Sequence, residues 1–198
     1  MASVRIVVAS EHHSTQEIAD RVGARLCERG HDVEVHTLCP GDKWLPPVGP
    51  LVIGSAVHDG AWLPEADHFV KKHAQELGSR PVWMYSVGMT AALPRPLRAL
   101  AARAEQPHIA GLVDLVHPRE HHRFSGVIRR GHLSRKGAVL FRLLGCRYGD
   151  HRDWTEIDAW AAGISRALEV RPDLTEHSGL AQSMRSGQRG SGDGPGER

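Results

Sequence analysis

Residues 4–26 read VRIVVASEHHSTQEIADRVGARL, and this stretch decides the fold. Its opening, VRIVV, is a β-branched run without strict alternation of apolar and polar residues, as in a parallel strand that is covered on both faces. The later part places Ile18, Val22 and Leu26 at helical intervals on one face. A buried strand followed within a few residues by an amphipathic helix is half of a parallel β-α-β unit.

The alternation of strands and helices continues along the chain. Strands are predicted at Met1–Ser10, Asp32–Leu38, Leu51–Ile53, Pro81–Ser86 and His122–Val127. Helices are predicted from Ser14 to Gly30, from Pro64 to Leu77, around Leu97–Ala104 and from Asp153 to Leu168, with Gly111–Val116 as an extended or helical connector. This order predicts an α/β protein of the flavodoxin-like type, a three-layer α/β/α sandwich with a five-stranded parallel sheet.

Two of the predicted helices begin with the spacing of a capping box. Ser14 stands three residues before Glu17, and Asp153 stands three residues before Glu156. In this motif the first residue caps the helix and the acidic residue bonds back to it. We therefore expect Ser14 and Asp153 to be N-cap residues.

The composition is that of an ordinary globular domain, with 40% apolar and 24% charged residues and a formal charge of +2. That charge is too small to indicate nucleic acid. No apolar run approaches the roughly 20 residues that cross a bilayer, and the N-terminus has no signal-peptide pattern, so we expect a cytoplasmic protein. Three cysteines without a CxxC pair are typical of reduced thiols. We expect one domain at residues 1–170 and a disordered, glycine- and serine-rich tail at 171–198.

Three loops follow predicted strands and are candidates for ligand binding, because ligands of open parallel sheets bind beyond the carboxyl ends of the strands. The first, residues 10–15, precedes a helix whose N-terminus favours an anion, and it carries three hydroxyl groups. The second and third, residues 54–62 and 86–90, contain small residues that let the backbone approach a flat ring. Two alternatives stay open: Ser14 acts only as a helix cap, or Trp62 is a core residue rather than a ring contact.

Several well-known motifs are missing from the first loop. It contains no GxGxxG and no GxxxxGK[ST], which speaks against a dinucleotide-binding domain and a nucleotide triphosphatase. Ser10 and Glu11 stand where a receiver domain would have paired carboxylates.

Six segments, taken together and in order, resemble flavodoxins and, more closely, the menaquinone-dependent protoporphyrinogen IX dehydrogenase family. They are VVASEHHSTQEIADRV, IGSAVHDGAWLPEADHFVKKHA, PVWMYSVG, HHRFSGVI, HLSRKGAVLFRLLG and YGDHRDWTEIDAWAAGI. The resemblance runs from about Val4 to Leu168. One departure is His13, which stands where the family's phosphate loops usually have glycine.

The resemblance implies FMN as the cofactor. It implies that the phosphate is held by Ser10, His12, His13, Ser14 and Thr15. It implies that the isoalloxazine lies between the second and third loops, at Ser55, Ala56, Val57, His58, Gly60, Trp62, Ser86, Val87, Gly88 and Met89.

The implied activity is that of an FMN-dependent oxidoreductase, which passes electrons from a reduced organic substrate to a quinone. Flavodoxins proper are strongly acidic and this chain is not, which favours the dehydrogenase branch. Two alternatives remain: an electron-transfer protein that docks on redox partner proteins, and a flavodoxin-like scaffold that has lost FMN.

A basic segment and a set of histidines complete the sequence predictions. Nine basic and two acidic residues lie between Arg119 and Arg152. Within this region, residues 129–147 have the pattern of an interfacial helix, which predicts contact with the inner face of the membrane or access for quinone; a packed helix or a homodimer contact is the alternative. Neither His12-His13 nor the histidines from 117 to 122 have known metal-ligand spacing, so no metal site is predicted.

Overall fold

The computed structural model describes residues 1–44, 47–94, 106–129, 131, 139, 141–143 and 145–169. The helices are α1 (Ser14–Cys27), α2 (Pro64–Lys72), α3 (Ala74–Gly78), α5 (Pro107–Val116) and α7 (Trp154–Glu169), with a 3₁₀ turn η1 (Thr90–Ala92). The strands are β1 (Ser3–Ala9), β2 (Asp32–Thr37), β3 (Leu51–His58), β4 (Ala61–Trp62), β5 (Val82–Gly88), β6 (Glu120–Ser125), β7 (Val127–Ile128) and β8 (Gly149–Asp150).

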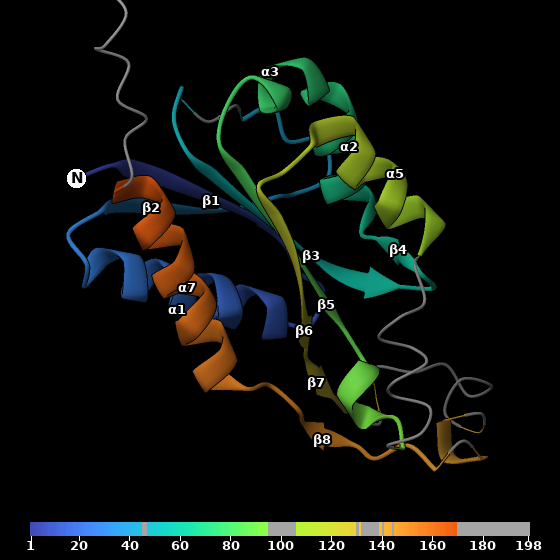
Figure 1. The fold of residues 1–198 in the computed structure, drawn as a ribbon. Helices are drawn as coiled ribbons and strands as arrows, with labels where there is room; N and C mark the ends of the chain where they lie inside the picture. The colour runs from blue at the N-terminus through green and yellow to red at the C-terminus, as the bar shows by residue number, and fades with distance from the viewer. Residues whose placement is uncertain are drawn as a thin grey trace, which may run out of the picture.

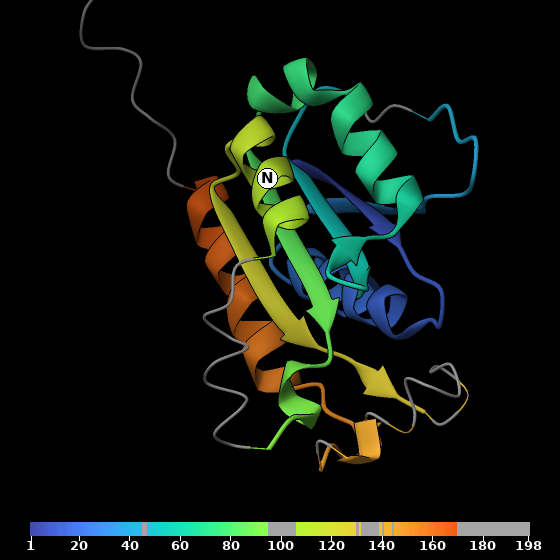
Figure 2. The ribbon, with the colours of Figure 1, turned by 90° about the vertical axis from the view of Figure 1, so that its right-hand side faces the viewer.

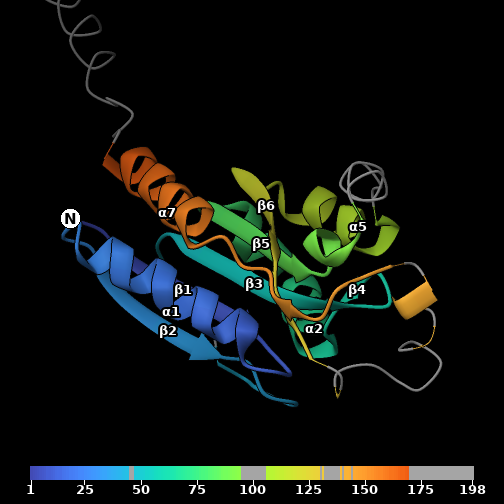
Figure 3. The same ribbon diagram turned by 90° about the horizontal axis from the view of Figure 1, so that it is seen from below.

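Five strands form a parallel sheet in the order β2-β1-β3-β5-β6. Helices α1 and α7 cover one face of this sheet, and α2, α3 and α5 cover the other (Figures 1 and 3). The short strand β4 turns back antiparallel onto β3, and β7 pairs with β8 in a separate small sheet. The structure thus confirms the predicted three-layer sandwich with five parallel strands. All five of these strands end toward one edge of the sheet, where β7 and β8 also lie (Figure 2).

Each face of the sheet has its own apolar core. On the α1 and α7 side, the rings of Tyr85, Phe124 and Trp160 pack edge to face with centroids 5.4 to 5.8 Å apart. Tyr85 also lies over Gly54 of the neighbouring strand, where an added Cβ would come within 1.9 Å of its ring. Glycine is therefore required at position 54, because the tyrosine ring occupies the space of a side chain.

Helices α1 and α7 are joined by an ionic network. Asp158 of α7 accepts hydrogen bonds from Arg21 and Arg25 of α1, at 2.7 and 3.0 Å from the two Nε atoms. These two guanidinium groups hold the pKa of the Asp158 carboxyl well below its usual range. The network holds together the two helices that cover this face.

The start of α1 differs from the prediction. Its N-cap is His13, with φ 63° and no side-chain cap, and Ser14 is already the first helical residue. The acidic partner of the expected capping box, Glu17, is ion-paired with Arg152 instead. Asp153 caps the start of α7 as predicted, because its Oδ1 accepts hydrogen bonds from the amides of Thr155 and Glu156.

Other boundaries shift by a few residues. The predicted helix from Pro64 to Leu77 is two helices, because the backbone leaves the helical region at His73, with φ −108° and ψ 15°. The last central strand ends at Ser125, and Val127 belongs to the separate strand β7. The connector at 111–116 is helical, as part of α5. The predictions for Leu97–Ala104 and for the tail at 171–198 fall outside the described residues.

Part of the basic segment at 129–147 is described. Phe141 is buried, and it packs with Ala92 and Ile128 in a small cluster of its own. Val139 and Leu143 are 60% and 79% exposed. Phe141, which belongs to the apolar face predicted for this segment, therefore packs inside the protein. Among the described helices, none is long and apolar enough to cross a bilayer.

Candidate functional site

A cavity of about 310 Å³ opens at the carboxyl ends of β1, β3 and β5, where the three predicted loops meet. Its walls come from the loop after β1, the end of β3 with its turn, the end of β5 and the passage from β6 to β7. The lining residues are His12, Ser14, Thr15, Ala56, Val57, His58, Asp59, Val87, Gly88, Met89, Gly126, Val127 and Ile128. This is the edge at which ligands of open parallel sheets bind.

The loop after β1 contains two buried hydroxyl groups without partners. Ser10 Oγ and Thr15 Oγ1 are shielded from solvent, and within the described part of the chain neither has a hydrogen-bond partner. Leaving a buried hydroxyl unpaired costs about 1–3 kcal/mol, so such groups usually find partners. Both belong to the loop and first turn at the N-terminus of α1, where backbone amides and the helix dipole favour an anion. The arrangement suits a bound acceptor such as a phosphate.

His13 supplies the sharp bend between this loop and α1. Its φ of 63° lies in the left-handed region, which favours glycine. This explains why glycine is usual at this position in the family that the sequence resembles. His13 adopts this bend with an exposed side chain, and it does not line the cavity.

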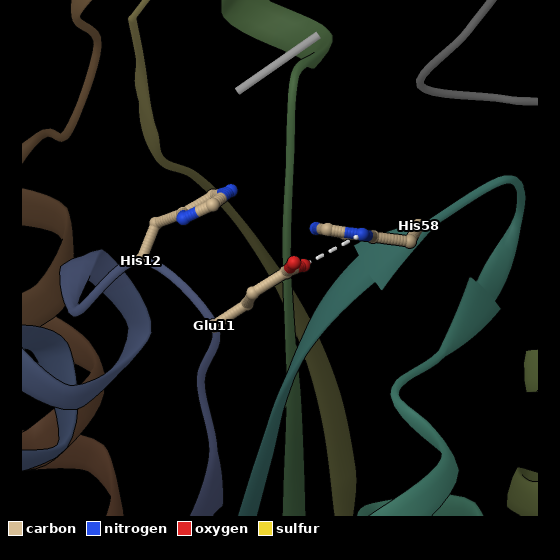
Figure 4. Close-up of side chains that lie close together, drawn as sticks. All are labelled: Glu11, His12 and His58. Carbon is tan, nitrogen blue, oxygen red and sulfur yellow. Dashed lines mark ion pairs between the residues drawn. The ribbon is translucent and has the colours of Figure 1, made fainter. Parts of the chain in front are cut away.

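The second wall is built on a tight hairpin between β3 and β4. His58 pairs with Ala61 across the two-residue turn Asp59-Gly60, and both turn residues have positive φ values, 48° and 79°. An Asp-Gly turn of this kind matches the twist of two antiparallel strands. The hairpin brings His58 toward Glu11 and His12 of the first loop (Figure 4).

Behind the cavity a chain of hydrogen bonds crosses three strands. Trp62 Nε1 donates to Ser86 Oγ at 2.7 Å, and Ser86 lies 2.8 Å from His121 Nε2. Ser86 Oγ accepts from the indole and can donate its own proton to His121 Nε2 when that nitrogen is the unprotonated one of a neutral imidazole. Burial lowers the pKa of His121 to about 4, which favours the same neutral form.

The structure places the fifteen predicted site residues in two groups. Nine of them line the cavity: His12, Ser14, Thr15, Ala56, Val57, His58, Val87, Gly88 and Met89. The other six are not in its lining: Ser10, His13, Ser55, Gly60, Trp62 and Ser86. Trp62 is only 4% exposed and packs in the core on the α2 side, as the alternative interpretation had it. Ser55 accepts a hydrogen bond from the Leu63 amide, which ties the hairpin to the start of α2.

Gly126, Val127 and Ile128 also line the cavity, although they were not among the predicted site residues. Gly126 is held there because its amide donates to the carbonyl of Gly88 at 2.9 Å. A Cβ at Gly126 would lie 2.8 Å from Val87 Cγ1 and 3.4 Å from Ser14 Oγ. The one available signal was a glycine inside the predicted strand His122–Val127, because a glycine within a strand often marks a site of close approach.

These residues fit FMN. The unpartnered hydroxyls at the N-terminus of α1 match a phosphate, and the small residues at the ends of β3 and β5 leave room for a flat ring. The fit does not depend on His13, because its side chain is outside the cavity.

Comparison with known proteins also indicates a flavodoxin-type domain. A family model described as a flavodoxin domain matches residues 5–143. A search of curated proteins found no match. Among solved structures, rubredoxin:oxygen oxidoreductase from Desulfovibrio gigas is similar at 14% identity and a TM-score of 0.56, over 84% of this chain and 36% of that one. Oxidised flavodoxin 2 from Bacillus cereus is similar at 17% identity and a TM-score of 0.53, over 85% of this chain and 99% of that one.

These structural similarities concern the fold, and the chain spans about a third of the Desulfovibrio enzyme. The family match covers most of the described residues, including most of β1 and all of α1, β3 and β5, which build the cavity. It also supports the cofactor predicted from the sequence, FMN. By fold, cavity position and family match together, this chain belongs to the flavodoxin-domain family.

Proposed function

We propose that the protein is an FMN-dependent oxidoreductase of the protoporphyrinogen IX dehydrogenase type, which passes electrons from a reduced organic substrate to a quinone. The observation that carries the proposal is a cavity at the N-terminus of α1 that is lined by Thr15, whose buried Oγ1 is unpartnered, with a second buried and unpartnered hydroxyl, Ser10 Oγ, in the adjoining loop. FMN, when bound, supplies the redox chemistry, because its ring accepts electrons from a donor and passes them to an acceptor.

The chain's own residues have binding and positioning roles in this proposal. Thr15 in the cavity lining and Ser10 in the adjoining loop would hold the phosphate, assisted by the amides of the first turn of α1. The backbone at the ends of β3 and β5 would hold the ring system, and Trp62 holds Ser86 in place through its indole N–H. A protein that only positions and tunes a flavin needs no catalytic acid-base pair.

The proposal of an enzyme rather than an electron carrier is supported by charge. The chain has a formal charge of +2, and nine basic residues lie between Arg119 and Arg152, so the acidic docking surface of a flavodoxin proper is not a feature of its composition. One observation favours an electron carrier: Met89 at the edge of the cavity is 45% exposed, so a redox partner protein has access there.

Turnover with small molecules separates these two functions. FMN-loaded protein is mixed anaerobically with protoporphyrinogen IX and a soluble menaquinone analogue, and porphyrin fluorescence is followed. We expect porphyrin fluorescence to rise together with quinone consumption over many turnovers. In Thr15→Val the rate of this rise should be lower, because less FMN is bound. Thr155→Val is the matched control, since Thr155 is the exposed second residue of α7 as Thr15 is the buried second residue of α1. Flavin reduction without any turnover of quinone would favour the carrier.

The proposed quinone chemistry extends to contact with the membrane through residues 129–147. Exposed Val139 and Leu143 beside Arg142 support an apolar and basic contact with anionic lipid. Sedimentation with anionic vesicles at low salt tests this contact: wild type should pellet and Leu143→Glu should stay in solution. If both stay in solution, the segment is assigned to packing, or to a homodimer contact if the protein also elutes as a dimer.

A further inference from the structure

We propose that Glu11, His12 and His58 form a binding site for a divalent transition-metal ion such as Zn²⁺ at the mouth of the cavity. One possible ligand atom from each residue lies within 4.8 Å of the others. His58 Nδ1 is 3.0 Å from Glu11 Oε2, and the rings of His12 and His58 are 6.2 Å apart with a 38° tilt. Figure 4 shows the three side chains approaching one another from the loop after β1 and from the end of β3, with the ion pair between Glu11 and His58.

The donor set selects the class of metal. Two imidazole nitrogens and one carboxylate oxygen suit Zn²⁺ and its neighbours in the first transition row, whereas Mg²⁺ and Ca²⁺ prefer oxygen ligands throughout. Zinc ligands at 2.0–2.2 Å in a tetrahedron are about 3.3 Å from one another. The separation of Glu11 from His58 is already close to this value, so small rotations of exposed side chains complete the set. A fourth position stays open for water.

Backbone geometry brings the ligands together. Glu11 and His12 directly precede the left-handed bend at His13, and His58 is fixed by the Asp59-Gly60 turn. The sequence separates the two halves of the site by 46 positions, so no local spacing reveals them. Parallel pairing of β1 with β3 places both at one edge of the sheet.

The site shares two residues with the candidate cofactor cavity. His12 and His58 line that cavity, whereas Glu11 does not. A metal ion that binds both imidazoles draws them toward Glu11 and across the opening. We therefore expect metal and FMN to compete; this consequence rests on the proposed function, whereas metal binding itself does not.

The first experiment uses full-length protein without flavin. Zn²⁺ binding is measured by calorimetry, and Co²⁺ is used as a spectroscopic probe of coordination. We expect one site in wild type and at least a tenfold loss of affinity in both Glu11→Gln and His58→Ala. His108→Ala is the control, because His108 is an exposed histidine on α5 outside the cluster. Equal affinity in wild type, both ligand variants and the control would overturn the proposal, since binding would then be due to other histidines.

The second experiment tests competition. FMN affinity is measured by quenching of flavin fluorescence with and without saturating Zn²⁺. We expect zinc to weaken FMN binding at least fivefold in wild type and to leave it unchanged in Glu11→Gln, which loses a metal ligand and keeps both imidazoles of the cavity. No change in wild type, or tighter FMN binding with zinc, would contradict competition. If FMN binds in neither buffer, the proposed function fails while the zinc titration still decides the metal site.

Discussion

Buried hydroxyl groups are hydrogen-bonded in the interior of the sheet, whereas two at its carboxyl edge have no partner among the described residues. In the interior, Ser86 is bonded to Trp62 and His121, and the Tyr85 hydroxyl donates to the carbonyl of Thr15. At the carboxyl edge, Ser10 and Thr15 keep buried hydroxyls that no described residue bonds.

An unpaired buried hydroxyl costs stability, and both of these occur at the N-terminus of one helix beside one cavity. The difference teaches that these interior hydroxyls are bonded within the protein, whereas the two at the edge are available to a ligand. Changes to the interior should therefore alter stability, and changes to the edge should alter binding.

The largest effect is expected from Gly54→Ala, in the interior. The new Cβ would lie 1.9 Å from the ring of Tyr85, which is enclosed between β3, α1 and α7 and cannot move away. We expect a loss of about 3 kcal/mol or more in the free energy of unfolding by urea. Gly78→Ala is the control, because nothing lies within 4 Å of its Cβ position, and its effect should be within about 1 kcal/mol. Equal effects would mean that Tyr85 is not confined as described.

The second effect is a pH dependence of the interior hydrogen-bond chain. His121 has a folded pKa of about 4, whereas an unfolded histidine has a pKa near 6.5. Between these values the unfolded chain binds the proton and the folded protein does not, so stability is full above about pH 6.5 and falls as the pH drops toward 4.

Because His121 is partly exposed, we expect a loss of about 1–2 kcal/mol between pH 7.5 and 5 from this group. Urea unfolding of wild type and His121→Gln at both pH values measures it. The variant removes the titrating group, so its stability should depend less on pH. An equal dependence in both proteins would show that the other histidines account for it.

Thr15→Val makes the comparison sharper, because it removes an edge hydroxyl without changing side-chain volume. We expect FMN affinity to fall about tenfold, or about 1.4 kcal/mol, and the stability of the flavin-free protein to stay equal or rise by about 1 kcal/mol. Thr155→Val should leave FMN affinity unchanged. A loss of flavin-free stability in Thr15→Val would place this hydroxyl with the bonded groups of the interior.

The smallest effect is expected from His13→Gly. Glycine adopts the observed φ of 63° without strain but gains freedom in the unfolded chain, so the two contributions to stability oppose each other. We expect a change below about 1 kcal/mol in stability and less than tenfold in FMN affinity. A hundredfold loss of FMN affinity would make the imidazole a principal ligand.

Sequence reasoning predicted the interior better than the edge. The apolar runs of β1 and β5 and the helical spacing in α1 and α7 report burial directly, and their positions are right to within a few residues. The cap at Ser14 was wrong because the left-handed bend at His13 places the start of the helix one residue earlier than the capping motif implies. The resemblance implied that Trp62 and Ser86 contact the ring; their side chains bond each other, and neither is in the lining of the cavity at the ends of β1, β3 and β5.

The edge depends on contacts between segments that are distant in sequence. Gly126 reaches the cavity because β6 pairs parallel to β5, and His58 reaches Glu11 because β3 pairs parallel to β1. The order of the strands in the sheet determines both contacts, and neither leaves a local pattern in the sequence. The unpartnered state of the Thr15 hydroxyl is likewise visible only in three dimensions.

The most direct test of the account is a titration of the flavin-free protein with FMN, followed by flavin fluorescence. If the carboxyl edge is completed by a phosphate-bearing flavin, fluorescence should be quenched with a stoichiometry of about one FMN per chain, and Thr15→Val should require about tenfold more FMN. No quenching at about 50 μM FMN in wild type would contradict the account, and the domain would then be a flavodoxin-like scaffold that has lost FMN.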